Sequence, residues 1–328
     1  MTAPVETTFQ PWVRRRPGWM VIARKEFADH ILSVRFVALL VILSLVAVGT
    51  VYSAADALRD VAPVATEANS LFLKLFTVQA DPIPLSFLTF FGFLAPVLGI
   101  AYGFDAVNGE RSQGTLPRLV SQPIHRDDVI NGKFVAGLGV VGLTLVVVTA
   151  VVAGLGIFML GITPSAAEVV RILVWLVAGI LYVGVWLAFA TLCSVLVRRA
   201  STSALIAIAL WLVLALFGTL LAQLAADVIS PVSAADPQTQ IANVETELAL
   251  SRLSPITLFE EASSALLNPE VRTVGLVTLA QLDQAIVSEL TVPQSILLVW
   301  AQIVGLVAAT VVIFAIAYVS FLRQEVRA

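Results

Sequence analysis

The sequence predicts an all-α membrane protein that crosses the bilayer six times. Hydrophobic residues make up 59% of its 328 residues, charged residues only 12%, and the mean hydropathy is +0.96. Soluble domains are about 45–50% apolar and about 25% charged, so this chain has too little polar surface to cover a water-soluble globule. Its apolar residues gather into six runs of about 20 residues or more, long enough to span a hydrocarbon core as helices. The runs cover roughly residues 36–56, 84–105, 134–160, 169–197, 203–226 and 295–322.

The distribution of arginine and lysine predicts how these runs are oriented, because cytoplasmic loops are enriched in both residues. If both termini are cytoplasmic, the inner segments carry 14 of the 19 basic residues and the outer segments carry five. The opposite orientation would reverse this strong bias. A cleaved signal peptide is the alternative explanation of the first run. However, about 35 residues precede that run, far more than an ordinary n-region contains.

Residues 1–35 are predicted to form a cytoplasmic segment that ends in an amphipathic helix. After Pro17-Gly18, apolar residues recur at intervals of three or four, the spacing of one helical face; they are Trp19, Ile22, Ala23, Phe27, Ile31 and Val34. Charged residues occupy much of the remaining surface, among them Arg24, Lys25, Glu26 and Asp29. We expect this helix to lie in the cytoplasmic interface of the bilayer, in contact with membrane lipids. It is either a simple lipid anchor or an elbow helix that also contacts a cytoplasmic partner.

The polar stretch between the second and third runs, residues 106–133, indicates a surface built to touch another molecule. A simple connection would be far shorter, and this one holds helix-forming segments separated by turn signals. Thr115 is expected to cap a helix that begins near Leu116 and ends at Pro123. The alternative is that these residues only shape a turn between two membrane helices.

Two outer segments are predicted to contain helices that do not span the membrane. In the first, residues 57–83, the sequence ANSLFLKLFTV fits a helix that rests on the outer membrane surface. In the second, residues 227–294, one helix lies around TQIANVETELALSRL. Another begins at Ser254-Pro255, an N-cap followed by proline, and stops at Asn268-Pro269. The second segment is either a docking site for an extracytoplasmic partner or a passive loop.

Signals for enzyme chemistry are weak throughout the sequence. It contains neither a G-x-x-x-x-G-K-[ST] nucleotide site nor an H-E-x-x-H metal site. Two histidines and the single Cys193 do not make a familiar metal site, and that cysteine has no partner for an intrachain disulfide. The G-x-G-x-x-G match at residues 137–142 lies inside an apolar run, where small residues favour close helix packing. We therefore expect no catalytic residue, cofactor, metal or nucleic-acid partner in this chain.

Ionisable residues are missing from the middle of the six runs. Asp105 and Arg171 fall near the ends of theirs. Ion-coupled transporters usually keep such groups at membrane depth as relays or ion sites. Their absence suggests that the energy source lies outside this chain, and it leaves a channel or secondary carrier as a distant alternative.

The cytoplasmic stretch resembles the first cytoplasmic loop of ABC-2-type transporter permeases. The matching residues are NGERSQGTL at 108–116, LVSQP at 119–123, Arg126, and GKF at 132–134. RKEF at 24–27 and Arg35-Phe36 are similar to the same family, as is the six-run layout of residues 36–322. The outer SPITLFEEA at 254–262 resembles the subgroup related to the nitrous-oxide-reductase maturation permease. The longer outer segments of this chain depart from the family pattern.

This resemblance implies a permease subunit in a prokaryotic plasma membrane, with both termini and the tail 323–328 in the cytoplasm. ATP and Mg would bind to separate ABC ATPase subunits, and a second permease copy or paralogue would stand beside this chain. The implied function is coupling of ATP hydrolysis to substrate movement, in the export direction. The alternative is a mechanotransmitter that acts on an extracytoplasmic protein through residues 227–294 without carrying a solute.

Two groups of residues are expected to serve this coupling. In the loop, Glu110 can contact basic groups, the rigid guanidinium of Arg111 can reach carboxylates, and Gly114 permits a tight bend. The loop group is Glu110, Arg111, Gly114, Thr115, Leu116 and Arg118. The group on the interface helix is Trp19, Arg24, Lys25, Glu26 and Phe27.

Overall fold

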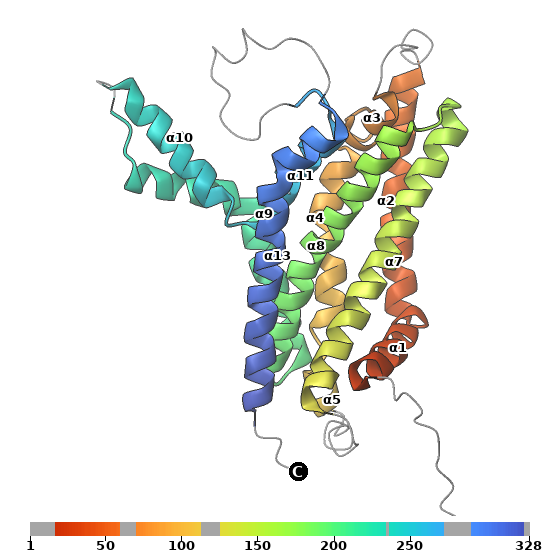
Figure 1. The fold of residues 1–328 in the computed structure, drawn as a ribbon, viewed down its shortest axis with the longest axis vertical. Coiled ribbons are helices and arrows are strands. Elements are labelled where there is room, and N and C mark those ends of the chain that lie inside the picture. Colours follow the sequence, from red (N-terminus) through yellow and green to blue (C-terminus); the bar gives the residue numbers. More distant parts are fainter. Residues whose placement is uncertain (1–16, 60–69, 113–124, 234–235, 272–289, 325–328) are drawn as a thin grey trace, which may run out of the picture.

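The computed structural model describes residues 17–59, 70–112, 125–233, 236–271 and 290–324. In these ranges the regular elements are all helices, and the long ones stand side by side as a bundle (Figure 1). Six stretches are long and apolar enough to cross a membrane: Val34–Arg59, Phe87–Ser112, Arg126–Leu160, Ala166–Leu196, Ala200–Ile229 and Val292–Arg323. The predicted fold class is therefore confirmed.

The long helices are α2 (Val34–Arg59), α4 (Phe87–Gly103), α7 (Arg126–Leu160), α8 (Ala166–Leu196), α9 (Ala200–Ile229) and α13 (Val292–Arg323). A turn joins α4 to the short α5 (Asn108–Ser112). The other helices are α1 (Gly18–Ile31), α3 (Leu71–Thr77), α10 (Pro237–Ser251) and α11 (Pro255–Leu267). α1 and α5 lie at one end of the bundle, and α3 and α11 lie at the other (Figure 1).

Local sequence signals explain where several helices begin. α8 starts with a capping box, in which Ser165 Oγ accepts from the Glu168 N–H and the Glu168 carboxylate accepts from the Ser165 N–H. Thr291 and Gln294 make the same box at the start of α13. α11 begins after Ser254 and ends before Asn268, at the predicted positions. α7 ends at Gly161, which adopts a left-handed φ of 67°.

α8 forms the centre of the bundle. Of its most apolar stretch, 67% is buried inside the chain, compared with 11% for α9. Gly99 and Gly103 let α4 cross α8 at very short range, because an added Cβ would lie 2.5 Å from the Val183 carbonyl oxygen and 2.7 Å from the Ala190 Cβ, respectively. Two small residues four positions apart on one helix allow backbones to approach in this way.

α3 does not rest on the surface, as its sequence suggested, but is buried among the larger helices. Five of its seven residues are buried: Leu71, Phe72, Leu73, Leu75 and Phe76. The helix contacts α2, α4, α7, α8 and α11. Because its apolar residues cover most of its surface, with only Lys74 and Thr77 polar, the helix inserts among the others. The surface prediction for this segment was wrong.

The two helices expected between the fifth and sixth long helices are present. α10 packs back along α9, held by the Asn243 amide, which donates to the Asp227 carboxylate at 3.0 Å and the Ser230 carbonyl at 2.9 Å. This α9–α10 hairpin projects sideways from the bundle (Figure 1). α11 instead returns into the bundle, where Phe259 stacks on Tyr182 with ring centroids 4.6 Å apart and on Phe91 at 5.5 Å.

Candidate functional site

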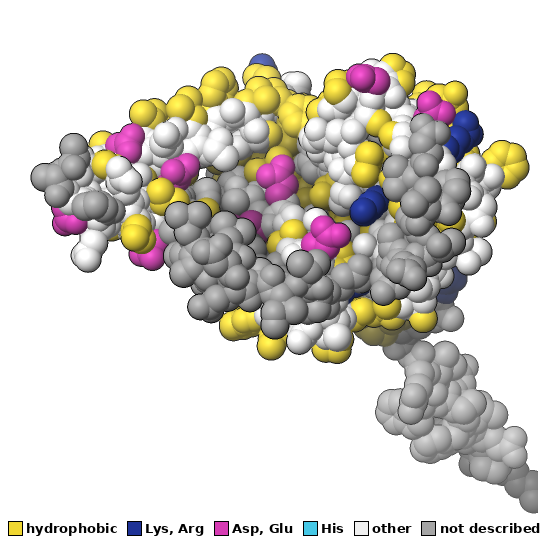
Figure 2. Space-filling model, turned by 90° about the horizontal axis from the view of Figure 1, so that it is seen from above, with side chains coloured by type: hydrophobic (Ala, Val, Ile, Leu, Met, Phe, Trp, Pro, Cys, Tyr) yellow, Lys and Arg dark blue, Asp and Glu magenta, His cyan; other side chains and the backbone are white. Residues whose placement is uncertain are grey.

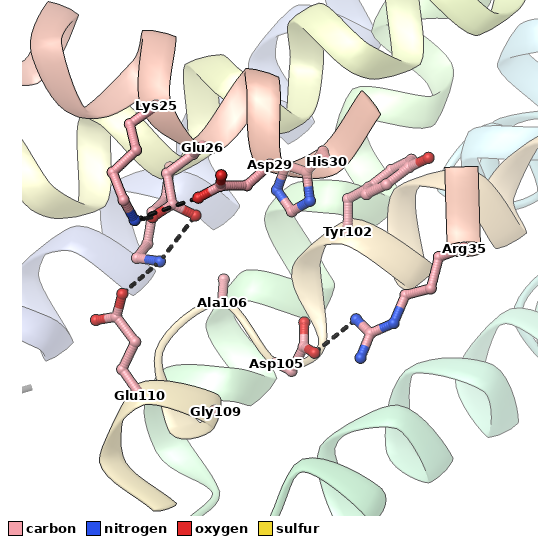
Figure 3. A pocket seen from close by; sticks show the side chains of 11 residues that line it. Lys25, Glu26, Asp29, His30, Arg35, Tyr102, Asp105, Ala106, Gly109 and Glu110 are labelled. Atoms are coloured by element: carbon pink, nitrogen blue, oxygen red, sulfur yellow. Dashed lines mark hydrogen bonds and ion pairs between the residues drawn. The ribbon is translucent and has the colours of Figure 1, made fainter. Parts of the chain in front are cut away.

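The candidate site surrounds α5 at the end of the bundle that holds α1. A polar pocket of about 260 Å³ separates α1 from the turn between α4 and α5. Figure 3 shows acidic and basic side chains that point toward one another in this pocket. Its ionisable lining is Lys25, Glu26, Asp29, His30, Arg35, Tyr102, Asp105, Glu110 and Lys133.

Lys133 joins three helices. Its ammonium nitrogen lies 2.8 Å from the Glu110 carboxylate on α5 and 3.2 Å from the Glu26 carboxylate on α1. The Lys133 side chain is only 9% exposed, so solvent screens these ion pairs less than a surface pair. Lys25 approaches the same Glu26 at 3.7 Å from the outside. Lys133 therefore ties both α1 and α5 to the start of α7.

A second ion pair fixes the start of α2. The Arg35 guanidinium lies 2.6 Å from the Asp105 carboxylate and 5.1 Å above the centre of the Phe104 ring. Both contacts are to the turn between α4 and α5. A cation over an aromatic face adds to the attraction of the carboxylate. This end of α2 is thus tied to the same short segment as α1.

His30 lines the pocket from α1 and packs against an aromatic ring. Its ring meets the Tyr102 ring edge-on, with centroids 5.0 Å apart. Burial lowers the pKa of His30, the nearby Lys133 and Arg35 lower it further, and Glu26 and Asp105 oppose this shift. Folding therefore lowers the pKa of His30 relative to that of the unfolded chain.

The beginning of α5 is held by the end of α8. Ser194 Oγ accepts hydrogen bonds from the backbone N–H groups of Val107 at 3.0 Å and Asn108 at 3.1 Å. The Asn108 amide in turn donates to the Val197 carbonyl at 3.3 Å. Because the first N–H groups of a helix have no partner within it, this single hydroxyl satisfies two of them and fixes α5 to α8.

Gln324, just after α13, connects three more elements. Its side-chain oxygen accepts from Arg111 of α5, and its side-chain nitrogen donates to the Val195 carbonyl of α8 at 2.7 Å. Its backbone carbonyl accepts from the Arg126 guanidinium at 3.2 Å. Sequence reasoning missed this residue, because a glutamine in a short polar tail carries no local signal.

The apolar stripe of α1 packs on α7. An added Cβ at Gly132 would lie 2.8 Å from the Ile22 side chain, and one at Gly139 would lie 3.3 Å from the Phe27 ring. Ile22 is buried, and Trp19 lines a shallow groove with Phe134. Much of the predicted stripe therefore contacts protein, whereas Val34 at its end is exposed.

The structure brings together many of the residues predicted to serve coupling. Glu110 and Arg111 of α5 contact Lys133 and Gln324, respectively, while Lys25 and Glu26 belong to the cluster. Arg24 is exposed on the outer side of α1. The remaining predicted loop residues lie outside the described residues; they are Gly114, Thr115, Leu116 and Arg118.

A second polar cluster holds the opposite end of the bundle. Glu168 accepts from the Phe72 N–H of α3 at 3.1 Å. Arg171 donates to the Leu266 carbonyl of α11 at 3.3 Å and the Ser295 hydroxyl of α13 at 2.8 Å. Glu168 and Arg171 lie near the start of α8, and the sequence had placed Arg171 near the end of its apolar run. Their burial, at 7% and 3% exposure, was not foreseen.

This bundle of apolar helices, with polar clusters at its two ends, defines a multi-pass membrane protein. The family model described as ABC-2 family transporter protein matches residues 20–326, and the chain belongs to this family. Its six long apolar helices fit a membrane-embedded member of this family.

Two relatives bear the name "Probable ABC transporter permease protein NosY". The chain is 29% identical to the protein from Stutzerimonas stutzeri over 196 residues, which is 58% of this chain and 64% of the relative. It is 29% identical to the protein from Pseudomonas aeruginosa over 153 residues, 47% of this chain and 48% of the relative. The matches thus span less than two thirds of the length of either relative.

Proposed function

We propose that this permease couples ATP hydrolysis by separate ATPase subunits to movement of a substrate across a prokaryotic plasma membrane, in the export direction. The observation that carries the proposal is the set of polar contacts that hold α5 in place. Ion pairs and hydrogen bonds from α7, α8 and the segment after α13 converge on this one-turn helix, and Lys133 of α7 joins α1 to it. A push on residues 113–124, which join α5 to α7, would therefore move the bundle helices together.

The proposal places the end of the bundle that holds α5 in the cytoplasm, with both termini. The charge on the opposite face supports this orientation. Figure 2 shows that face from above, where acidic side chains outnumber basic ones. Sparse basic residues are typical of segments outside the cytoplasm.

The contacts of Glu110 and Arg111 suggest how the two residues act. Glu110 is bound to Lys133 and Arg111 to Gln324, so both would position the loop from inside the chain. Direct contact with the ATPase would fall to the loop itself, with Gly114, Thr115, Leu116 and Arg118. Because Lys133 links α1 to α5, α1 and the loop would form one docking platform. ATP and Mg would bind to the ATPase subunits and not to this chain.

A second copy or paralogue of the permease would complete the transporter. α9 buries the smallest share of its apolar stretch, 11%, and so offers a long apolar surface to a neighbouring helix or to lipid. Substrate would then move between two copies, because in the described residues the interior around α4, α8 and α11 is filled by stacked aromatic rings.

The alternative function is mechanical action on an extracytoplasmic protein, without transport of a solute. Two observations favour it as the second candidate. α11 is packed into the bundle through Phe259, and the α9–α10 hairpin projects beyond it (Figure 1). Movement of the bundle would therefore move the segment that an outer partner could bind.

The test of coupling uses Glu110→Ala, Arg111→Ala and Gly114→Val in the complex purified with its ATPase subunits. We expect normal membrane expression, because all three residues lie outside the apolar runs. Each alanine removes polar contacts worth about 1–3 kcal/mol when desolvated, so stimulated ATP hydrolysis or assembly should be lost. If all three variants show the same stimulated ATP hydrolysis and the same assembly with the ATPase subunits as the wild type, the coupling role is refuted. A separate measurement distinguishes the two candidate functions: ATPase activity in liposomes that a solute stimulates would indicate transport and not mechanotransmission.

A further inference from the structure

α5 and α11 lie at opposite ends of the same pair of helices. α8 and α13 pack together along much of their length, and near the middle of the pair the Gly184 position approaches the Thr310 side chain, with 3.8 Å to an added Cβ. Closely packed helices have few voids that could absorb a displacement. Movement imposed at one end of this pair should therefore appear at the other.

Polar contacts fix α11 to both helices of the pair. Arg171 of α8 donates to the Leu266 carbonyl near the end of α11 and to Ser295 of α13. Gln302 of α13 donates to the Glu261 carboxylate of α11 at 2.9 Å. Water would weaken such contacts at the surface, but Arg171 and Gln302 are only 3% and 5% exposed, respectively. A movement of the α8–α13 pair should therefore also move α11.

At the other end, the Gln324 side chain bridges α5 and α8. Its carbonyl oxygen accepts from Arg111, and its amide nitrogen donates to the Val195 carbonyl. A side-chain amide can do both, whereas a carboxylate only accepts and an ammonium only donates. Because Gln324 directly follows α13, the same residue joins α5 to the ends of both helices of the pair.

We propose that Gln324 is a positioning residue that delivers the movement of α5 to the α8–α13 pair and, through that pair, to α11. The inference rests on the proposed function, because the ATPase acting on residues 113–124 is the source of the movement. It deepens that function by assigning the helices that carry the movement and the residue at which they receive it. It also makes α11 the element that responds at the outer end.

The experiment measures an ATP-dependent distance at the outer end of the chain. Spin labels are placed on Leu253, 79% exposed beside the start of α11, and on Tyr52, 55% exposed on α2. Cys193→Ala removes the native thiol. The label distance is recorded in the complex with its ATPase subunits, without nucleotide and with ATP and vanadate.

Three variants test the junction. Gln324→Met keeps a side chain of similar length but removes both hydrogen bonds, while the backbone carbonyl at 324 can still accept from Arg126. Gln324→Glu keeps an acceptor for Arg111 and loses the donor to Val195. The control is Leu322→Met, a partly exposed neighbour at the end of α13.

We expect the ATP-dependent change in distance to fall at least twofold in Gln324→Met, to be intermediate in Gln324→Glu and to match wild type in Leu322→Met. The ATPase subunits should still co-purify with Gln324→Met. An undiminished change in that variant would overturn the inference and leave the proposed function standing. Loss of the ATPase subunits would overturn it too, since Gln324 would then act in docking. If the wild-type complex shows no change, the proposed function fails and the inference falls with it.

Discussion

At the scale of single residues, the site depends on side chains that each serve several helices. Lys133 has two carboxylate partners, Ser194 accepts two backbone N–H groups, and Gln324 contacts α5, α7 and α8. Loss of one such residue leaves several polar groups without a partner at once. Replacing it should therefore cost more free energy than breaking a single surface contact.

Lys133 allows this expectation to be measured. Lys133→Met should lower the free energy of unfolding by about 1–3 kcal/mol, between the values for exposed and fully buried ion pairs, because Glu26 and Glu110 would lose the buried cation that pairs with both. Lys133→Arg should restore part of the loss. Lys25→Met is the matched control, because the Lys25 side chain is 67% exposed and its ion pairs are screened. The measurement is thermal unfolding in detergent, and equal losses in the two methionine variants would contradict the assignment.

His30 predicts how the same end of the bundle responds to acid. Burial lowers its pKa below the usual value of about 6.5. The unfolded chain therefore binds the proton more readily, so stability is present above pH 6.5 and is lost as pH falls through and below that value. The wild-type melting temperature should drop more between pH 7.5 and 5.5 than that of His30→Gln, as read by thermal unfolding in detergent. Identical pH profiles would show that His30 does not contribute.

At the scale of helices, glycines decide which elements can touch. α4 meets α8 at Gly99 and Gly103, and α7 meets α1 at Gly132 and Gly139. The sequence predicted close packing on α7 from its run of small residues. The glycine pair on α4 was not predicted to pack closely, because the sequence does not say which helix two glycines four residues apart will face. Only the packed bundle shows which helix they face.

The α4–α8 crossing gives a prediction with an internal control. Gly99→Ala should destabilise the bundle by about 1–3 kcal/mol, the usual cost of overpacking, because its Cβ would meet the Val183 carbonyl oxygen at 2.5 Å. Gly154→Ala, on α7, should be neutral or stabilising by about 0.5–1 kcal/mol, since no atom lies within 4 Å of its added Cβ. Thermal unfolding of the two variants measures the difference. If Gly154→Ala loses as much stability as Gly99→Ala, helix crowding is not the cause.

At the scale of the whole molecule, the sequence predicted what depends on local signals. Helix lengths, the start of α11 at Ser254-Pro255 and its end at Asn268 follow from apolar runs, caps and proline. Contacts between distant segments could not be predicted, because nothing local to Lys133 or Gln324 specifies their partners. The burial of α3 depends likewise on five other helices that surround it. The loop motif thus pointed to the candidate site around α5, while the contacts between the helices around it are visible only in the fold.

The exposed length of α9 raises the last question at this scale, which is where a second copy would dock. Exposure alone does not decide, because apolar side chains are equally stable against lipid. However, α9 has the least buried apolar stretch of the six long helices, 11% compared with 17% for α13 and 28% for α2. Val213, Phe217 and Leu224 are 44–55% exposed on it. α2 also exposes apolar residues, among them Leu45 at 65%, and serves as the control surface.

We expect single cysteines at Val213, Phe217 or Leu224, in a Cys193→Ala background, to form disulfide-linked dimers on mild oxidation in native membranes. A cysteine at Leu45 should stay monomeric. A disulfide forms only when the two Cα atoms lie within about 7 Å, so a linked dimer would place the two α9 helices in direct contact. The measurement is the fraction of dimer on a non-reducing gel. Linkage at Leu45 with none on α9 would move the interface to α2, and linkage at both in equal amounts would indicate random collision in the membrane.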